Sequence, residues 1–225
     1  MQEIYTQSEA QPLLSTNKVL KNTYMLLALT LGVSAVACGI SMAMELGRGT
    51  ALLMNLVALG LVWFVLPRTA NSANGIYVVF AFTALLGASL GPTINHYLQF
   101  SYGSQIIMQA LGGTAAVFLG LSTYVLTTKK DFSFMRGFLI TGLIVVLLCA
   151  VALMVAGMFG VAIAGASLAI SAAIVMLMSG FILYDTSRIV NGGETNYVMA
   201  TVSLYLNIYN LFLALLHILG ATSDD

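Results

Sequence analysis

The sequence predicts an all-α integral membrane protein, a bundle of seven transmembrane helices. Of its 225 residues, 60% are hydrophobic and only 7% are charged, and the mean hydropathy is +0.97. A soluble domain carries roughly a quarter charged residues, so water would solvate this chain poorly. The apolar residues also gather in runs long enough to cross a bilayer, for which a helix needs about 20 residues.

Seven apolar runs follow one another along the chain, and each predicts one transmembrane helix. They cover residues 24–44, 51–66, 75–91, 104–127, 137–158, 163–184 and 198–219. A long polar segment containing Pro12 precedes the first run, unlike a cleaved signal peptide, so we expect this run to be retained. The second run is short, so to cross the membrane it must either include flanking residues or be tilted only a little. The third reaches Gly91-Pro92, where we expect the helix to break or kink.

The basic residues predict how the helices are oriented. If the N-terminus is cytoplasmic, the far side holds only Arg48, and the cytoplasmic segments hold the other seven: Lys18, Lys21, Arg68, Lys129, Lys130, Arg136 and Arg188. Cytoplasmic loops of membrane proteins carry such an excess of Lys and Arg. We therefore predict a cytoplasmic N-terminus and, after an odd number of spans, a C-terminus on the far side.

Little of the chain is left for a soluble domain. We expect a flexible cytoplasmic tail from Met1 to Asn22, which has no apolar period, a transmembrane domain over 23–220 and a short tail over 221–225. The formal net charge of +0 provides no basic face for nucleic acid. The two His and two Cys residues are scattered singly, so we predict neither a metal site nor a cofactor.

Polar side chains within the last run are the first functional candidates, because such residues are costly in a membrane. Ser203, Asn207, Asn210, Ala214 and His217 recur at helical spacing and therefore share one face. Two interpretations remain open. The face either forms interhelical hydrogen bonds, worth about 0.6 kcal/mol each, or lines a polar path through the bundle.

Asp185, at the end of the sixth run, is the second candidate. Arg188 follows three residues later, so the simpler interpretation is an ion pair on the helix surface. The alternative is that Asp185 begins the polar path of the last helix. Its neighbour Tyr184 invites comparison with intramembrane aspartyl proteases, but those need a second carboxylate, which the apolar runs lack.

A serine-protease interpretation rests on Gly87-Ala88-Ser89-Leu90-Gly91, which matches the G-x-S-x-G pattern. A nucleophilic serine needs a base within hydrogen-bond reach, and His96 and His217 are the candidates. Close packing of small residues explains the pattern equally well. We therefore predict no catalytic residue and no enzymatic activity.

Small residues also mark one face of the first run, where Thr30, Ser34, Ala37 and Ser41 lie at helical spacing. Faces of this kind let membrane helices approach closely. We expect this face to pack tightly against another helix.

Over nearly its whole length the chain resembles the Bax inhibitor-1 family, and within it the bacterial inner-membrane modulators of the protease FtsH. The stretches that carry the resemblance are LLSTNKVLKNTY (13–24), LGGTA (111–115), YVLTTKKD (124–131), GGETNY (192–197) and ATVSLYLNIYN (200–210). The resemblance implies that the last helix is central in the bundle. It also implies a bacterial inner membrane, so that the far side is the periplasm.

The resemblance implies two different activities. The first is binding of FtsH, a membrane-anchored AAA protease, and its membrane-associated complex, which restrains the degradation of other membrane proteins. The tail from Met1 to Asn22 would then be the segment that the protease engages. The second is a pH-sensitive calcium leak, in which two aspartates on the last two helices share a proton and close the pore. Their positions here are Asp185 and Asn207.

An amide does not titrate, so this chain lacks the carboxylate pair, although Asp185 could accept a hydrogen bond from Asn207. The leading interpretation is therefore a non-enzymatic modulator of FtsH that affects membrane protein quality control. The alternatives are a cation leak with an altered gate and a structural protein whose polar face only packs. The residues of the candidate gate or polar path are Asp185, Arg188, Ser203, Asn207, Asn210 and His217. Glu194, in the GGE turn, receives no role.

Overall fold

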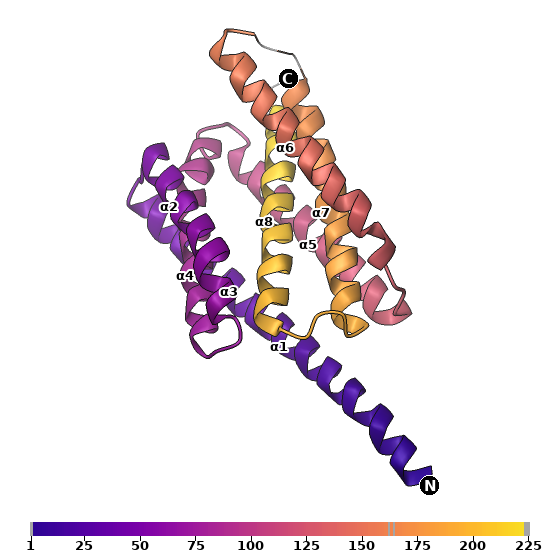
Figure 1. The fold of residues 1–225 in the computed structure, drawn as a ribbon. Coiled ribbons are helices and arrows are strands. Elements are labelled where there is room, and N and C mark those ends of the chain that lie inside the picture. Colours follow the sequence, from indigo (N-terminus) through magenta and orange to yellow (C-terminus); the bar gives the residue numbers. More distant parts are fainter. Residues whose placement is uncertain (1, 162, 164, 223–225) are drawn as a thin grey trace. The chain divides into compact units, whose positions relative to one another are not determined.

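The structure is a computed structural model that describes residues 2–161, 163 and 165–222, with side chains described from Thr16 onward. Figure 1 shows the elements in chain order. They are α1 (Gln2–Ala43), α2 (Arg48–Gly60), the π-helical η1 (Leu61–Val65), α3 (Leu66–Thr69), α4 (Asn74–Tyr97), α5 (Gly103–Thr128), the 3₁₀-helical η2 (Ser133–Met135), α6 (Arg136–Met158), α7 (Ala166–Val190) and α8 (Tyr197–Ala221). The described residues form no strand.

Seven helical segments are long and apolar enough to span a membrane, as the sequence predicts. They are Thr16–Ala43, Arg48–Thr69, Asn74–Tyr97, Gly103–Thr128, Ser133–Met158, Ala166–Val190 and Tyr197–Ala221. Large apolar side chains such as Trp63, Phe64 and Leu148 lie on their outer surfaces, 69%, 63% and 64% exposed. Surfaces this apolar suit lipid rather than water.

The second span is the irregular one. It runs from Arg48 to Thr69 through α2, η1 and α3, so it recruits flanking residues on both sides of the short apolar run. The π-helical turn at Leu61–Val65 comes just before Pro67. Single π-turns inside α-helices are a usual way to absorb a local misfit of the backbone.

Of the expected break or kink at Pro92, the break is wrong, because α4 continues through this residue to Tyr97. The segment around Pro92 is held to α1: Gly91 is buried against Ser41, and the Nδ2 of Asn95 donates to the carbonyl of Met42 at 3.1 Å. Neighbouring helices of this kind allow proline inside membrane helices. Packing thus outweighs the local preference of the Gly-Pro pair.

The expected flexible tail, Met1 to Asn22, stays a prediction, and its last residues are described as part of a helix. Asn22 is helical and half-buried, and residues 16–22 continue as one helix into the first apolar run. The physical reason is that residues 16–22 contain neither Gly nor Pro, so a helix already formed in the membrane extends into them at little cost.

The two ends of the chain lie partly outside the description. Met1, where the expected tail begins, lies outside the described residues, and so do residues 223–225 of the C-terminal tail. Of residues 2–15 only the backbone is described. The tail's role in engaging a protease therefore stays a prediction.

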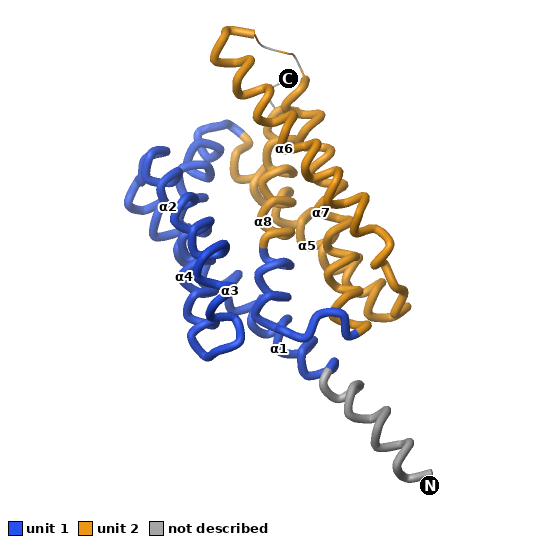
Figure 2. The backbone as a smooth tube through the Cα atoms, viewed as in Figure 1, with its two compact units in different colours: residues 1–101, 192–205 blue, residues 102–191, 206–225 orange. Residues whose placement is uncertain are grey.

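The chain divides into two compact units, coloured in Figure 2. Unit 1 contains residues 1–101 and 192–205, and unit 2 contains residues 102–191 and 206–225. Helix α8 is the element that supplies residues to both, and half of its most apolar stretch is buried (50%), the largest share of the seven spans.

In unit 1, the small-residue face of α1 packs against α4, as the sequence predicts. A Cβ added to Gly87 would lie 2.5 Å from the Cα of Ser34, and one added to Gly91 would lie 2.7 Å from the Cβ of Ser41. Only glycine allows the two backbones to come this close. The G-A-S-L-G stretch is therefore a packing surface.

In unit 2, α7 packs against both α5 and α6. Gly142 of α6 lies under Leu177, and Gly180 of α7 lies under Leu139, whose side chain is 1% exposed. The remaining surface of α6 is strongly exposed, since only 6% of its most apolar stretch is buried.

Candidate functional site

Asp185 and Asn207 meet in unit 2, on α7 and α8. The Nδ2 of Asn207 donates to the Oδ2 of Asp185 at 2.8 Å, although the residues are 22 positions apart. Asn207 is 7% exposed and Asp185 is half-buried. The hydrogen bond that the resemblance of these positions suggested is therefore present.

The chemistry of this pair follows from its two groups. A carboxylate that accepts from an amide N–H gains one hydrogen bond in its charged form, and the amide has no proton to exchange. The pair therefore holds α7 and α8 together without sharing a proton.

Arg188 makes a contact that the interpretation as an ion pair does not include. Its guanidinium carbon lies 5.7 Å from the centre of the Tyr184 ring, within the range of a cation–π contact. Tyr184 is itself 9% exposed, so the arginine covers a buried ring at the end of α7.

The other residues of the predicted polar path do not converge on Asp185. The Nδ2 of Asn210 donates to the Leu206 carbonyl of its own helix at 2.8 Å. The Nδ1 of His217 lies 2.9 Å from the Oγ of Ser171, a residue of α7 that is 7% exposed. Ser203 belongs to the part of α8 that lies in unit 1. The spacing correctly places these residues on one helix, but the contacts described for Asn210 and His217 do not involve Asp185.

Hydroxyl residues beside Asp185 were missed by the sequence reasoning. Thr186 and Ser187 are both 0% exposed, and the Oγ1 of Thr186 lies 3.4 Å from the Oγ of Ser122 on α5. The Oγ of Ser187 donates to the Lys130 carbonyl at 3.2 Å and accepts the backbone N–H of Phe132 at 2.9 Å. The end of α7 thus anchors the loop between α5 and α6. The run Asp185-Thr186-Ser187 was the available signal, since three polar residues in a row are costly in a membrane helix.

Unit 1 contains a second buried polar cluster, centred on Tyr205 of α8. The Oγ of Ser34 donates to the Thr83 carbonyl at 2.7 Å and lies 2.7 Å from the Tyr205 hydroxyl, which also donates to that carbonyl at 3.3 Å. The Tyr205 ring is 1% exposed and meets Phe82 edge to face, with centroids 5.8 Å apart. Helices α1, α4 and α8 are joined at this point.

Ser89, the candidate nucleophile, has the surroundings of a packing residue. Its Oγ donates to the Leu86 carbonyl at 2.7 Å and to the Oδ1 of Asn55 at 3.1 Å, and neither acceptor is a general base. The ring of His96 contacts Tyr97 and Phe100. Within the described part of the chain, no group of three His, Cys, Asp or Glu residues is placed to hold a metal ion.

Comparison with known proteins gives the family. The family model described as "Inhibitor of apoptosis-promoting Bax1" matches residues 16–224. The chain is 50% identical over 218 residues to a protein of Vibrio cholerae described as an uncharacterized membrane protein, covering 97% of this chain and 96% of the relative. It is 49% identical over 213 residues to the Escherichia coli protein named modulator of FtsH protease YccA, covering 95% of this chain and 94% of the relative.

A third relative, from a second strain of Escherichia coli, is named inner membrane protein YccA. It too is 49% identical over 213 residues, covering 95% of this chain and 94% of the relative. The family match includes all seven membrane spans and both polar clusters. The protein described above, with its seven apolar helices and its Asp185–Asn207 pair, belongs to the Bax inhibitor-1 family.

Proposed function

We propose that this protein binds FtsH and restrains its degradation of other membrane proteins, without catalysis of its own. The support is its 49% identity, over nearly the whole of both chains, to a relative named modulator of FtsH protease. The relative named an inner membrane protein supports the bacterial inner membrane as the location. The N-terminus would be cytoplasmic and the C-terminus periplasmic, because seven of the eight Lys and Arg residues then lie inside.

The N-terminal segment is the part of the chain that the protease would engage. This segment is the expected tail, Met1 to Asn22, whose last residues, 16–22, are helical and continuous with the first apolar run. An AAA protease that pulls membrane substrates by a cytoplasmic tail would pull these residues. A pulling force on the tail would therefore act on α1 before any other helix.

The observation that carries the proposal is that α1 is anchored at separate levels along its length. Thr201 donates to the Thr23 carbonyl at 3.3 Å, the Ser34 hydroxyl joins Thr83 and Tyr205, and Asn95 donates to the Met42 carbonyl at 3.1 Å. At the levels of Ser34 and Met42, Gly87 and Gly91 also bring the α4 backbone against α1.

Extraction of α1 would have to break all of these contacts inside lipid. Lipid offers no hydrogen bonds in exchange, so each unpaired group adds to the free energy of extraction. A protease that grips the tail would stall, and a stalled protease degrades fewer other substrates. The protein would thus act as a substrate that is engaged readily and released slowly.

The test is purification of the protein in mild detergent from cells at native expression, followed by identification of bound proteins by mass spectrometry. Recovery of FtsH and its membrane companions is expected, together with their loss when residues 2–15 are deleted. This deletion leaves the whole span Thr16–Ala43 in place. Recovery of FtsH at equal yield from both forms would contradict engagement through the tail.

A cation leak is the second candidate, and one observation favours it: Asp185 is a half-buried acid near the end of a membrane span, next to buried Asn207. Acidic side chains at such depth commonly line ion pathways. Calcium flux into liposomes containing the protein tests it, with Asp185→Asn as the comparison. Equal flux in protein-free liposomes and in both protein samples would exclude the leak.

A further inference from the structure

The loop between α5 and α6 and the first residues of α6 present basic and aromatic side chains together. Lys129, Lys130 and Arg136 are exposed, and Phe134 and Phe138 are 80% and 71% exposed. The loop joins two membrane spans, so it lies at a membrane–water interface. Exposed phenylalanine rings are unfavourable in water but favourable at the boundary between headgroups and acyl chains.

The loop is held in place by a buried hydroxyl rather than left free. The Oγ of Ser187, 0% exposed, accepts the Phe132 N–H and donates to the Lys130 carbonyl. The Nδ2 of Asn191 also donates to this Oγ at 3.3 Å. The backbone on both sides of Asp131 is therefore fixed to the end of α7.

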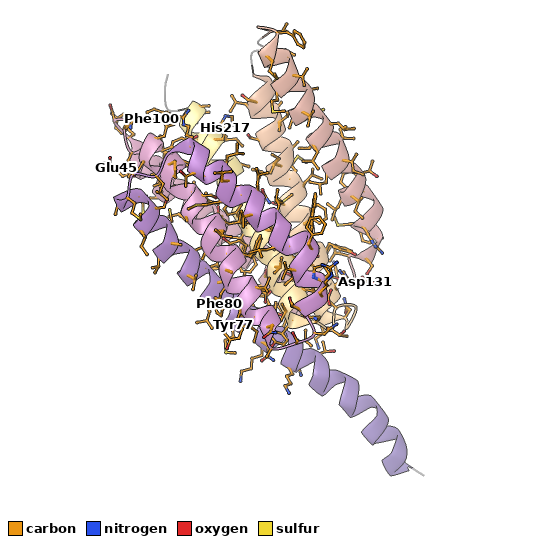
Figure 3. The ribbon with its side chains drawn as sticks, turned by 60° about the vertical axis from the view of Figure 1, so that its left-hand side comes forward. Glu45, Tyr77, Phe80, Phe100, Asp131 and His217 are labelled. Carbon is orange, nitrogen blue, oxygen red and sulfur yellow. The ribbon has the colours of Figure 1, made fainter. Side chains whose placement is uncertain are left out.

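Contacts within the loop engage its acidic side chain and leave its basic side chains accessible. The one acid of the loop, Asp131, labelled in Figure 3, accepts hydrogen bonds from the backbone and hydroxyl of Ser133. Its carboxylate is thus turned toward its own loop. The Lys130 ammonium donates to the Tyr124 hydroxyl at 3.0 Å and lies 5.6 Å from the centre of that ring, which leaves further N–H groups of the ammonium for another acceptor.

The aromatic rings continue outward from this lysine. The ring of Phe132 lies 6.3 Å from that of Tyr124 and 6.3 Å from that of Phe134. A row of rings therefore leads from the ammonium of Lys130 to the exposed Phe134. An amphiphile with an anionic head and an apolar tail could place its head beside the lysine and its tail beside the phenylalanine rings.

We infer that this loop is a binding site for the anionic headgroup of a phospholipid, with Lys129 and Lys130 contacting the phosphate and Phe134 and Phe138 inserted beside the acyl chains. Ser187 acts as a positioning residue, since it fixes the loop without reaching the lipid. The site does not depend on protease binding. Charge complementarity selects anionic over zwitterionic lipids, because each basic side chain at such a surface attracts negative lipid.

The experiment measures equilibrium binding of a fluorescent phosphatidylglycerol analogue to the full-length protein in neutral detergent. Unlabelled phosphatidylglycerol is expected to displace it, whereas phosphatidylethanolamine and inorganic phosphate are not. The double variant K129Q/K130Q is expected to bind roughly 25-fold more weakly, about fivefold for each charge. Both side chains are exposed, so this variant does not endanger folding.

The matched control is K18Q/K21Q, which removes two exposed lysines of α1 and should change binding by less than about twofold. Ser187→Ala keeps every charge and should still weaken binding by at least about fivefold if position matters. Equal losses of lipid affinity in K129Q/K130Q and K18Q/K21Q would mean that only general charge attraction is at work, and would overturn the site. Displacement of the fluorescent analogue by inorganic phosphate alone would overturn the lipid as the ligand of this site. The lipid would also be overturned if K129Q/K130Q bound lipid normally but no longer recovered FtsH.

Discussion

At the scale of single residues, the amide of Asn207 decides what the Asp185 site can do. It is buried, and it donates to the Asp185 carboxylate at 2.8 Å. A single oxygen in place of this nitrogen would create the carboxylate pair.

Asn207→Asp is therefore expected to make the protein sensitive to pH. Two carboxylates at hydrogen-bond distance repel each other unless they share a proton, so the melting temperature of the variant should fall as the pH rises from about 5 to about 8. The reciprocal double variant D185N/N207D restores an amide–carboxylate pair and should remove this dependence. A melting temperature for Asn207→Asp as independent of pH as that of the double variant would count against the pairing.

Tyr205 is the residue whose hydroxyl joins three helices. Tyr205→Phe keeps the ring against Phe82 and leaves Ser34 bonded to the Thr83 carbonyl, so it removes only the tyrosine's own hydrogen bonds. We expect a loss of about 0.6 to 1.7 kcal/mol in the free energy of unfolding, measured by denaturant titration in mixed micelles. Tyr77→Phe is the control, because Tyr77 is 73% exposed. Equal effects of the two variants would mean that the cluster does not stabilise unit 1.

At the scale of elements, α1 and α4 form the tightest described pair because glycine replaces side chains at their contact. Gly87→Ala would place a Cβ 2.5 Å from the Cα of Ser34, so the helices must separate. Overpacking of this kind costs about 1 to 3 kcal/mol. Gly32→Ala, on α1 with no atom within 4 Å of the added Cβ, is expected to leave stability unchanged. Denaturant titration compares the two; a tolerated Gly87→Ala would contradict the close packing.

Asp131, in the α5–α6 loop, predicts how the stability of the protein depends on pH at acidic pH. Hydrogen bonds from the hydroxyl and then the backbone of Ser133 hold the pKa of the Asp131 carboxyl below its usual range. A carboxyl whose pKa is lower in the folded state adds stability above its unfolded pKa and loses it as the pH falls through the folded pKa. When the pH is lowered below about 4, the melting temperature of the protein should therefore fall. It should fall less in Asp131→Asn, because the amide oxygen accepts the same hydrogen bonds at every pH. Identical pH profiles of the two proteins would contradict this assignment.

At the scale of the whole molecule, hydropathy predicts the seven spans because the length of an apolar run is set by the bilayer. The local signals at their ends were less reliable. Pro92 does not end α4, since contacts with α1 hold the helix beyond it, and α1 is already helical at Asn22, before the first apolar run begins. Packing with another helix is not visible in a run of residues.

The candidate site was predictable only in part, for a similar reason. The family resemblance suggested that Asn207 could donate a hydrogen bond to Asp185, and the structure contains that bond. Ser34 and Tyr205 lie 171 positions apart, and Ser187 meets a loop 57 positions away, so no local pattern announces either contact. Hydroxyl groups bond to whatever backbone the fold brings near, and one sequence does not reveal which.

The central claim is that FtsH engages the N-terminal segment and is then held up by the anchored α1. The most direct measurement is the rate at which purified FtsH degrades a second membrane substrate in proteoliposomes, with and without this protein. The intact protein should slow that degradation, the form lacking residues 2–15 should not, and Tyr205→Phe should itself be degraded faster and inhibit less. Equal inhibition by the intact and the shortened protein would contradict the claim.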